Sequence, residues 1–325
     1  MKALVCHEIG DFDTLAIGEL PEPEAGPGEM VVEMDAAAVN FADLLVLQDL
    51  YQFRATPPFA PGMEGVGRVV AIGSGVDGWS VGDRIAAVGY SGAFAERWVV
   101  QASHAVHVPD DAPTDVAAAM PVGYGTSYHA LKQRAKLQPG ETVLVLGAAG
   151  GVGAATIDLA AAMGAEVIAA ASTQEKLDFC TDLGAHHTIN YADDDLRDRI
   201  KEITGGAGID VVYDPVGGDM SEAAFRSLKW NGRHLVIGFA SGTIPKLPLN
   251  LPLLKGASLV GVFWGAFAAH EPEANAENAE EMFSMLREGE IRPRITERFS
   301  LDDAAEALNV VAERRVVGRV LVEIS

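Results

Sequence analysis

The sequence is poor in cysteine and in positive charge. It has only 2 cysteines, Cys6 and Cys180, in distant segments, which is too few for a disulfide framework or a structural zinc site. Lysine and arginine number 24 against 46 acidic residues, which gives a formal net charge of −22. A basic face is the usual footprint of nucleic-acid binding, so this charge argues against a nucleic-acid partner. Any anionic ligand must therefore be held by a few local donors.

Long apolar runs are also missing. The longest one, LVGVFWGAFAA at residues 259–269, is shorter than the ~18 residues that a membrane-spanning helix needs. The start of the sequence, MKALVCHEIGDF, becomes polar at His7 and Glu8 and is not typical of a signal peptide. We therefore expect a cytoplasmic protein that has no membrane partner.

The pattern of apolar runs predicts an α/β protein with two domains. Up to about residue 120 the sequence is rich in glycine and proline, and its short apolar runs (GVGRVVAIG, DRIAAVG) are typical of a compact, mostly antiparallel β domain. From residue 141, apolar strands alternate with helices of about ten residues, which predicts a parallel sheet with helices on both faces. The strand-like GRVLVEIS at the end should return to the first domain. We expect one domain over residues 1–120 and 266–325 and the other over 121–265.

Individual elements can be placed in the second of these domains. The expected strands include EVIAAAS, HTINY, IDVVYDPV and RHLVIGF. The expected helices cover residues 151–163, 174–183, 195–204 and 220–229. The adjacent pair His186 and His187 has no partner cluster in the sequence and is expected to be a loop feature.

A glycine-rich turn follows the first apolar strand of this domain. Gly147, Gly150 and Gly153 stand at three-residue spacing. Glycine permits a tight turn and a close approach of the backbone to a pyrophosphate. The helix that follows offers free N–H groups and the positive end of its dipole. Because a strand precedes the turn and a helix follows it, the motif predicts a phosphate-binding site formed by Ala149, Gly150, Gly151, Val152 and Gly153.

The end of the next strand indicates which nucleotide binds. NAD sites usually place Asp or Glu there, where the carboxylate binds the ribose 2′-hydroxyl. Here the strand ends in Ala171, Ser172 and Thr173, and Lys176 lies one turn into the next helix. Glu175 is the nearby carboxylate, but it lies inside that helix. Hydroxyl groups and an ammonium suit a 2′-phosphate, which a carboxylate would repel. The pattern favours NADPH as the cofactor.

Several stretches together resemble one family. GAAGGVG at residues 147–153 resembles the AAxGGVG signature of zinc-independent quinone oxidoreductases, the zeta-crystallin branch of the medium-chain dehydrogenase/reductase superfamily. The stretches that match in the same order are AVNFADLLVLQDLY, PFAPGMEGVGRVVAIGSGV, GYGTSYHAL, LGAHHTINY, DPVGGD and VIGFASG, so the resemblance covers nearly the whole chain. It implies a GroES-like domain followed by a Rossmann domain that binds NADPH.

The resemblance also implies roles for single residues around the cofactor. Lys176 and Tyr191 would flank the 2′-phosphate. The residues along the nicotinamide side would be Thr126, Gly238, Phe239 and Ala240, and those that close on the cofactor would be Phe263 and Arg319.

On the substrate side, the resemblance places Asn40 and Tyr51 where family members have polar residues that face the nicotinamide. Asn40 could hydrogen-bond a carbonyl oxygen or the cofactor, and Tyr51 could do the same or simply pack. Some relatives have a tyrosine five residues after the asparagine, where this chain has Leu45. Four aromatic residues either line a pocket for a flat substrate or fill the core: Phe53, Phe59, Phe263 and Trp264.

The same comparison indicates that the protein does not use zinc. Zinc-dependent relatives have a cysteine where this chain has Asn40 and a histidine where it has Met63, and they carry a four-cysteine lobe that this sequence lacks. Zinc binds thiolate, imidazole or carboxylate groups. Neither an amide nor a thioether is a good substitute, so we expect no metal.

The expected activity is NADPH-dependent hydride transfer to a quinone or similar conjugated carbonyl, with Asn40, Tyr51 and Thr126 as candidate catalytic residues. One alternative is reduction of an activated alkene, including enoyl thioesters such as acryloyl-CoA, for which Arg54 offers weak support as a coenzyme A contact. Another is a non-catalytic NADPH-binding role, as in the lens crystallins of this branch. SLVGVFWG at residues 258–265 resembles the edge strand that pairs across the family's homodimer, so we expect a homodimer.

Overall fold

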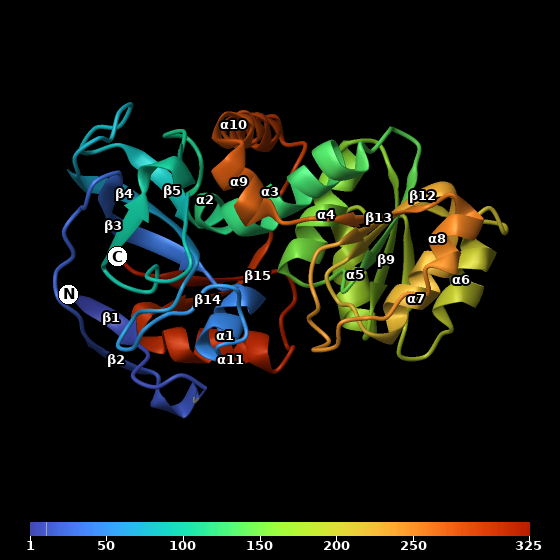
Figure 1. Cartoon of the computed structure of the whole chain (residues 1–325), viewed down its shortest axis with the longest axis horizontal. Coiled ribbons are helices and arrows are strands. Elements are labelled where there is room, and N and C mark those ends of the chain that lie inside the picture. Colours follow the sequence, from blue (N-terminus) through green and yellow to red (C-terminus); the bar gives the residue numbers. More distant parts are fainter. Residues whose placement is uncertain (11) are drawn as a thin grey trace. The chain divides into compact units, whose positions relative to one another are not determined.

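The chain folds into two units, each organised around its own sheet (Figure 1). Unit 1 comprises Met1–Val122, Phe267–Arg287 and Pro293–Ser325, and unit 2 comprises Gly123–Ala266 and Glu288–Arg292. The structure is a computed structural model that describes residues 1–10 and 12–325, apart from the side chain of residue 13. No helix in this described part of the chain is both long and apolar enough to cross a membrane.

Unit 1 is built on a seven-stranded, mostly antiparallel sheet in the order β14-β15-β3-β4-β5-β7, with β6 paired to β3 outside this order. Its strands are β3 (Glu29–Ala38), β4 (Glu64–Ile72), β5 (Arg84–Val88), β6 (Arg97–Gln101), β7 (Ala105–His107), β14 (Ile295–Ser300) and β15 (Arg319–Glu323). β15 pairs with β3, with Leu321 opposite Ala38, so the end of the chain completes the sheet that its beginning starts. A separate hairpin pairs β1 (Lys2–Val5) with β2 (Ala16–Glu19).

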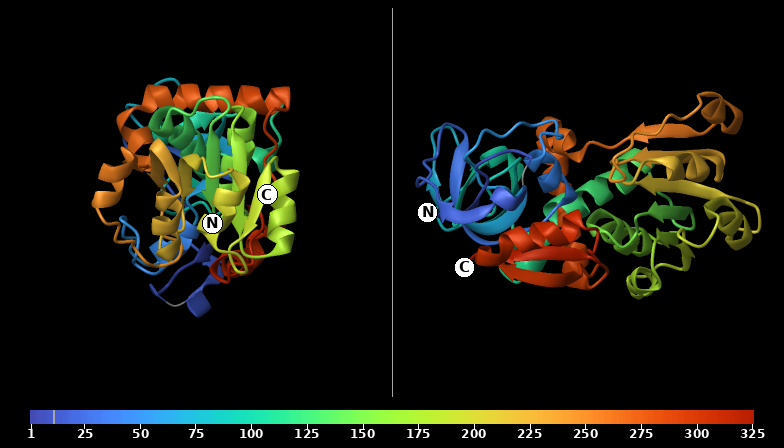
Figure 2. Two further views of the ribbon diagram at one scale, coloured as in Figure 1. Left: turned by 90° about the vertical axis from the view of Figure 1, so that its right-hand side faces the viewer. Right: turned by 90° about the horizontal axis from the view of Figure 1, so that it is seen from below.

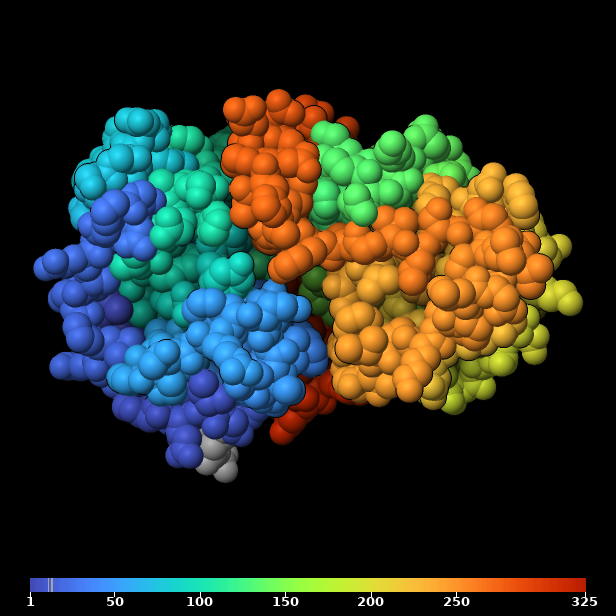
Figure 3. Space-filling model, viewed as in Figure 1, coloured from blue at the N-terminus to red at the C-terminus, as the bar shows by residue number. Residues whose placement is uncertain are grey.

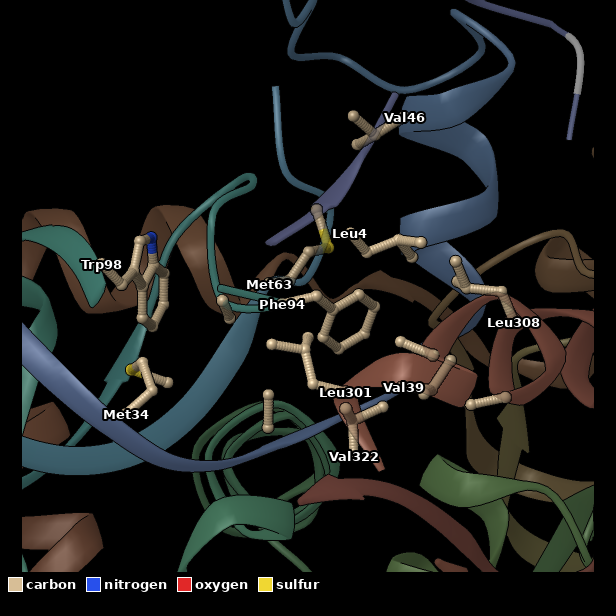
Figure 4. Packing of buried hydrophobic residues seen from close by; sticks show 14 of the residues in the cluster. Leu4, Met34, Val39, Val46, Met63, Phe94, Trp98, Leu301, Leu308 and Val322 are labelled. Atoms are coloured by element: carbon tan, nitrogen blue, oxygen red, sulfur yellow. The ribbon is translucent and has the colours of Figure 1, made fainter. Parts of the chain in front are cut away.

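The first and last parts of the chain also contain the helices α1 (Phe41–Leu47), α2 (Thr114–Ala119), α9 (Trp264–His270), α10 (Pro272–Glu288) and α11 (Ala304–Ala312). Of these, α2 and α11 contact strands of this sheet. In α11, Ala304, Ala307 and Leu308 are buried, and this i, i+3, i+4 spacing is that of a helix with one apolar face. Figure 4 shows Leu308 in the same core cluster as Val39 and Phe94, which come from segments far away in the sequence.

Unit 2 contains a six-stranded parallel sheet in the order β10-β9-β8-β11-β12-β13. Its strands are β8 (Thr142–Leu146), β9 (Glu166–Ala171), β10 (His187–Asn190), β11 (Ile209–Asp214), β12 (Leu228–Val236) and β13 (Ser258–Gly261). All five residues of β8 are buried, which explains its continuous apolar sequence, because a central parallel strand is covered on both faces.

The helices of unit 2 connect these strands (Figures 1 and 2). They are α3 (Pro121–His129), a π-helical turn (Ala130–Ala135), α4 (Gly151–Ala162), α5 (Gln174–Asp182), α6 (Leu196–Ile203), α7 (Asp219–Arg226) and α8 (Asn250–Lys255). The strand order reverses at β8, and right-handed crossovers then place the helices before and after this reversal on opposite faces of the sheet. The predicted α/β class, with a GroES-like β domain and a Rossmann domain, is confirmed.

Two local expectations were wrong. The helix expected over 220–229 ends at Arg226, and β12 begins at Leu228, because Leu228 pairs with Ile209 and is buried in the core. The histidine pair is not a loop feature, because His187 begins β10 and pairs with Ile168 of β9. Its Nε2 lies 2.9 Å from Glu166 Oε1. The other three expected helices match α4, α5 and α6 to within one residue at each end.

Candidate functional site

The glycine turn joins β8 to α4 in unit 2, and two of its glycines are required by the geometry. Gly147 has a φ of 57°, in the left-handed region that favours glycine. A Cβ at Gly153 would stand 2.4 Å from the carbonyl oxygen of Gly147, closer than atoms can approach. Gly150 differs, because a Cβ there would meet the same oxygen at 3.4 Å. The third glycine therefore lets α4 pack directly against the turn.

The beginning of α4 offers backbone N–H groups to a ligand. Gly150 is the N-cap and has no side chain to cap the helix, and the first helical hydrogen bond runs from Ala154 N to Gly150 O, at 2.8 Å. The N–H groups of Gly151, Val152 and Gly153 precede this bond, so they have no acceptor within the helix. Together with the helix dipole they form a site suited to a phosphate group.

A small polar network holds this first turn of α4 in place. Ser127 Oγ donates to the carbonyl oxygen of Val152 at 3.1 Å. Thr156 Oγ1 lies 2.8 Å from the same oxygen and 2.9 Å from Ser127 Oγ, and these two acceptors share its single proton. The Tyr213 hydroxyl on β11 lies 3.1 Å from Ser127 Oγ, and burial raises the pKa of Tyr213 to about 12. Tyr213 therefore stays protonated, and the network fixes the N–H groups without placing a charge beside them.

The carboxyl end of β11 is held by a buried carboxylate. Asp214 Oδ1 accepts from the backbone N–H groups of Val216 and Gly217, at 2.9 and 2.8 Å, and Oδ2 accepts from Ser221 Oγ at 2.5 Å. His234 Nε2 lies 3.0 Å from the same Oδ2. Burial acts to raise the pKa of Asp214, but the hydrogen bonds led by that of His234 outweigh it and lower the pKa. Asp214 thus shapes the loop next to the glycine turn, where the strand order reverses and ligands bind in this class of sheet.

The end of β9 carries the residues expected to select the nucleotide. Thr173 is the N-cap of α5, and its hydroxyl accepts from Lys176 N at 3.3 Å, so this hydroxyl is already used by the helix. Ser172 and Lys176 are half-buried. Tyr191 follows β10, donates its N–H to Ala171 O at 3.1 Å and packs on the core of unit 2. The structure therefore brings Ser172, Lys176 and Tyr191 to one end of two neighbouring strands.

Other predicted residues of unit 2 lie at the same edge of its sheet. Gly238, Phe239 and Ala240 follow β12, and Ala240 N donates to Pro215 O at 3.0 Å. Phe263 follows β13 and is half exposed. Because all six strands are parallel, these residues share the carboxyl edge with the glycine turn. Thr126 instead lies in α3, beside Gly125, where a Cβ would overlap the indole of Trp264.

In unit 1, a buried cluster of polar side chains forms where three neighbouring strands begin or end. Asn40 comes after β3, Glu64 begins β4 and Arg319 begins β15, and all three side chains are at most 6% exposed. Asn40 Nδ2 donates to Glu64 Oε1 at 2.7 Å and to Ala38 O at 3.3 Å. Arg319 Nη1 donates to Asn40 Oδ1 at 3.0 Å, and Arg319 Nη2 forms an ion pair with Glu64 Oε1. Arg319 is therefore engaged inside unit 1.

These contacts limit what Asn40 can do. An asparagine amide has two N–H donors and two acceptor lone pairs on its oxygen. The partners fix its orientation, because the carboxylate of Glu64 requires the nitrogen and the guanidinium of Arg319 requires the oxygen. Both N–H donors are used, so Asn40 retains only acceptor capacity. To donate to a substrate carbonyl, Asn40 would have to give up its hydrogen bond to Glu64 or to Ala38 O.

Asp43 adds a second carboxyl group to the cluster. Its Oδ2 accepts from the backbone N–H of Asn40 at 2.7 Å, and its Oδ1 has no hydrogen-bond partner among the described residues. Burial, with the nearby negative charge of Glu64, raises the pKa of Asp43 to about 8. Asp43 therefore holds a proton at neutral pH.

Tyr51 belongs to a group of aromatic residues in unit 1. Its ring centroid lies 6.4 Å from that of Tyr90, whose ring stacks on Phe53 with centroids 4.7 Å apart. Burial is the main cause that raises the pKa of Tyr51. Phe59 and Trp264 are buried in the cores of their units, whereas Phe53 is only partly buried. Of the four aromatic residues left open by the sequence, Phe59 and Trp264 fill the core.

Sequence reasoning did not anticipate the roles of Glu64, Asp43 and Asp214. Glu64 lies in GMEGVGRVV, where an acidic residue among glycines and apolar residues signals a buried, paired charge. Asp214 ends the apolar run IDVVYD, at the position where carboxyl ends of parallel strands meet ligands. Asp43 gives no comparable signal.

Within the described residues, no group of three or more His, Cys, Asp or Glu side chains is placed to hold a metal ion.

Two family models match this chain. The alcohol dehydrogenase GroES-like domain matches residues 26–110, and the zinc-binding dehydrogenase domain matches residues 151–282. The quinone oxidoreductase-like protein 2 of Bos taurus is 38% identical over 325 residues, which covers 99% of this chain and 92% of that protein. The chain belongs to the quinone oxidoreductase-like family of medium-chain dehydrogenases and reductases.

Solved structures agree with this family membership. The quinone oxidoreductase of Escherichia coli, solved in complex with NADPH, is 29% identical, with a TM-score of 0.92 over 99% of this chain and 100% of that chain. A 2-haloacrylate reductase is also 29% identical, with a TM-score of 0.88 over 99% of each chain. The quinone oxidoreductase-like fold thus extends over both units.

Proposed function

We propose that this quinone oxidoreductase-like protein uses NADPH to transfer hydride to a quinone or a similar conjugated carbonyl, without zinc. The observation that carries the proposal is the carboxyl edge of the unit 2 sheet. There, uncapped N–H groups follow the glycine turn, and β9 ends without a carboxylate. The E. coli relative that was solved with NADPH supports the same cofactor.

The residues at this edge fit NADPH. The N–H groups of Gly151, Val152 and Gly153 would bind the pyrophosphate, which can approach because these positions present only backbone or a small side chain. Ser172 and Lys176 would bind the 2′-phosphate, with Tyr191 beside them. When bound, NADPH supplies the hydride. Phe239 and Phe263, both partly exposed, are the proposed apolar contacts for its nicotinamide.

The chain's own residues supply orientation rather than strong acid or base chemistry. Asn40 keeps acceptor capacity and would accept from an N–H or O–H group, such as a carboxamide or a reduced hydroxyl. Arg319 and Glu64 hold Asn40 in this orientation. Thr126 and Tyr51 are the proposed hydroxyl contacts. A quinone suits such a site, because its reduced product is a stabilised anion that water can protonate.

The proposal that zinc takes no part rests on the side chains themselves. The two positions that carry cysteine and histidine in zinc-dependent relatives are Asn40 and Met63 in this chain. Asn40 is fully occupied as a donor, and Met63 is buried in the apolar core of unit 1. An amide and a buried thioether do not make the ligand set that zinc prefers.

A second candidate activity is the reduction of an activated alkene. The likeness to a 2-haloacrylate reductase favours it, because the substrate named for that protein is a conjugated carboxylate rather than a quinone. Both activities need the same cofactor and an electron-poor acceptor, so they differ only in the acceptor that the site admits.

The test is anaerobic NADPH oxidation against a panel of quinones, enones, haloacrylate and enoyl-CoA esters. We expect the highest kcat/KM with a quinone. Thr126→Val should lower kcat/KM, whereas Thr126→Ser, which keeps the hydroxyl, should retain most of it. Turnover only with alkenes or thioesters would select the second candidate. Stoichiometric NADPH binding with no turnover across the panel would instead support a non-catalytic role.

We also propose a homodimer formed through β13. This strand is last in the order of the unit 2 sheet, and an unpaired sheet edge invites pairing with another chain. Leu259 on β13 is 51% exposed, and Leu253 and Leu254 on the preceding α8 are also exposed. In Figure 3 the orange part of the chain, which contains α8 and β13, lies at the surface. Leu259→Lys should shift the protein to monomer in sedimentation velocity, whereas Val81→Lys, at an exposed position in unit 1, should not. A wild-type monomer at micromolar concentration would contradict the proposal.

A further inference from the structure

Unit 2 contains a cavity of about 560 Å³ that is separate from the glycine turn. It is lined by α6, the end of α7, the start of β12 and the end of α8. The cavity includes Gly206–Gly208, just before β11, and Arg226–Trp230, at the start of β12. Because β8, β11 and β12 are parallel, the starts of β11 and β12 lie at the edge opposite the glycine turn.

The lining of this cavity is basic in a strongly acidic chain. Five of the 24 lysine and arginine residues line it, against two carboxylates, Asp195 and Asp198. The five are Arg197, Lys201, Arg226, Lys229 and Lys255. Asp195 is the N-cap of α6 and already accepts from two backbone N–H groups. The cavity is therefore a local exception to the negative charge of the molecule.

Among the described residues, three of these five cations have no carboxylate partner. Arg226 pairs with Glu222 at 2.7 Å, and Lys229 pairs with Asp210 at 2.8 Å. Arg197, Lys201 and Lys255 form no ion pair within 4.0 Å among the described residues. Lys255 donates to the carbonyl oxygen of Leu228 at 2.7 Å, which orients its ammonium at the cavity.

Like charges from three helices meet here. Burial lowers the pKa of Lys255, and the positive charges of Arg197 on α6 and Arg226 on α7 lower it further. Such repulsion is unfavourable. A bound anion would offset it, because the anion would attract Arg197 and Lys255 at once.

An aromatic ring completes the lining. Trp230 lines the cavity and is 71% exposed, unusual for so large an apolar side chain. A Cβ at Gly256 would stand 3.1 Å from the indole atoms Cη2 and Cζ2, so the ring rests on that glycine. The rest of the ring is open to solvent. An open indole beside cations offers a stacking surface for a flat ring.

We propose that this cavity binds a phosphorylated ligand with a flat ring, of the size of a nucleoside monophosphate. Arg197, Lys201 and Lys255 bind its phosphate, and its ring stacks on Trp230. The cavity volume lies within the range of small-molecule sites, roughly 300–1,000 Å³. The site is distinct from the proposed cofactor site and requires no hydride transfer.

The test uses adenosine monophosphate as the probe and protein saturated with NADPH, so that the cofactor site is filled. Calorimetry should show saturable binding of one probe per chain, with adenosine and inorganic phosphate each binding at least tenfold more weakly. Arg197→Gln combined with Lys201→Gln should raise Kd at least tenfold. Trp230→Leu should raise Kd for adenosine monophosphate but leave that for phosphate unchanged. Lys136→Gln, at an exposed lysine of unit 2 outside the cavity, is the matched control.

Four results would overturn the proposal. These are an absence of saturable binding, a Kd that the paired variant leaves unchanged, displacement of the probe by added NADPH, and binding of an oligoribonucleotide without binding of the mononucleotide. Thermal melts of each variant separate loss of the site from loss of the fold. Quinone reduction is measured in parallel, so a failure of the proposed enzymatic activity is distinguished from a failure of this site.

Discussion

The two candidate sites are built in opposite ways. In unit 2, the glycine turn offers backbone N–H groups, and its neighbours Tyr213, Ser127 and Thr156 are uncharged. In unit 1, the cluster around Asn40 consists of charged and ionisable side chains that are almost completely buried. One site depends on the absence of side chains and the other on their pairing.

This difference determines how each site should respond to change. A backbone site is insensitive to pH but intolerant of an added atom wherever the turn leaves no room for one, as at Gly153. A buried charge cluster tolerates conservative shape changes but not the loss of one partner, because the charge left behind is buried without compensation. Four predictions, ordered from the largest expected effect, test this contrast.

The largest effect is expected from breaking the buried ion pair. Arg319→Met leaves Glu64 as a buried unpaired carboxylate and should lower the free energy of unfolding by about 3–5 kcal/mol, measured by urea denaturation. Glu64→Gln combined with Arg319→Met removes both charges and should recover most of this loss. If the double variant were as unstable as the single one, the pairing would not be what stabilises the cluster.

Adding one carbon atom to the glycine turn should have the next largest effect. Gly153→Ala forces a Cβ to within 2.4 Å of Gly147 O and should lower the free energy of unfolding by about 1–3 kcal/mol, measured by thermal denaturation without ligand. Gly150→Ala meets that oxygen at 3.4 Å and should keep the parent melting temperature. Equal melting temperatures for the two variants would contradict the contact geometry.

The cluster in unit 1, unlike the glycine turn, should make stability depend on pH. The pKa of Asp43 is about 8 in the folded protein and about 3.9 when unfolded. The protonated Asp43 therefore contributes fully to the free energy of unfolding below about pH 4, and this contribution is lost as the pH rises towards 8. Asp43→Asn removes this titration. The unfolding free energy of the variant relative to the parent should increase from pH 6 to pH 7, by at most about 1.4 kcal/mol.

A constant difference across that range would show that Asp43 does not hold its proton in the folded state. Gly150→Ala is the matched control, because it changes no titratable group and should follow the pH profile of the parent.

The smallest effect is expected at the end of β9, where side chains supplement the backbone site. Lys176→Ala should lower kcat/KM for NADPH about tenfold, which corresponds to ~1.4 kcal/mol, and leave kcat/KM for NADH nearly unchanged. Lys136→Ala, at an exposed lysine elsewhere in unit 2, should affect neither cofactor. Equal losses with both cofactors would show that Lys176 does not recognise the 2′-phosphate.

The same contrast explains what could be predicted from the sequence. The parallel sheet and the glycine turn follow from local pattern, because glycine spacing and apolar runs determine the backbone directly. The cluster in unit 1 could not be derived in this way. Asn40 and Arg319 are 279 positions apart, and only the pairing of β15 with β3 brings them together. The boundary between α7 and β12 was missed because the pairing of Leu228 with Ile209, a tertiary contact, decides it.

The most direct test of the account is steady-state reduction of 1,4-benzoquinone by protein that has been treated with a chelator and shown to contain no zinc. We predict that kcat/KM with NADPH is unchanged by this treatment and at least tenfold higher than with NADH. Loss of activity that added Zn²⁺ restores, or a preference for NADH, would contradict it.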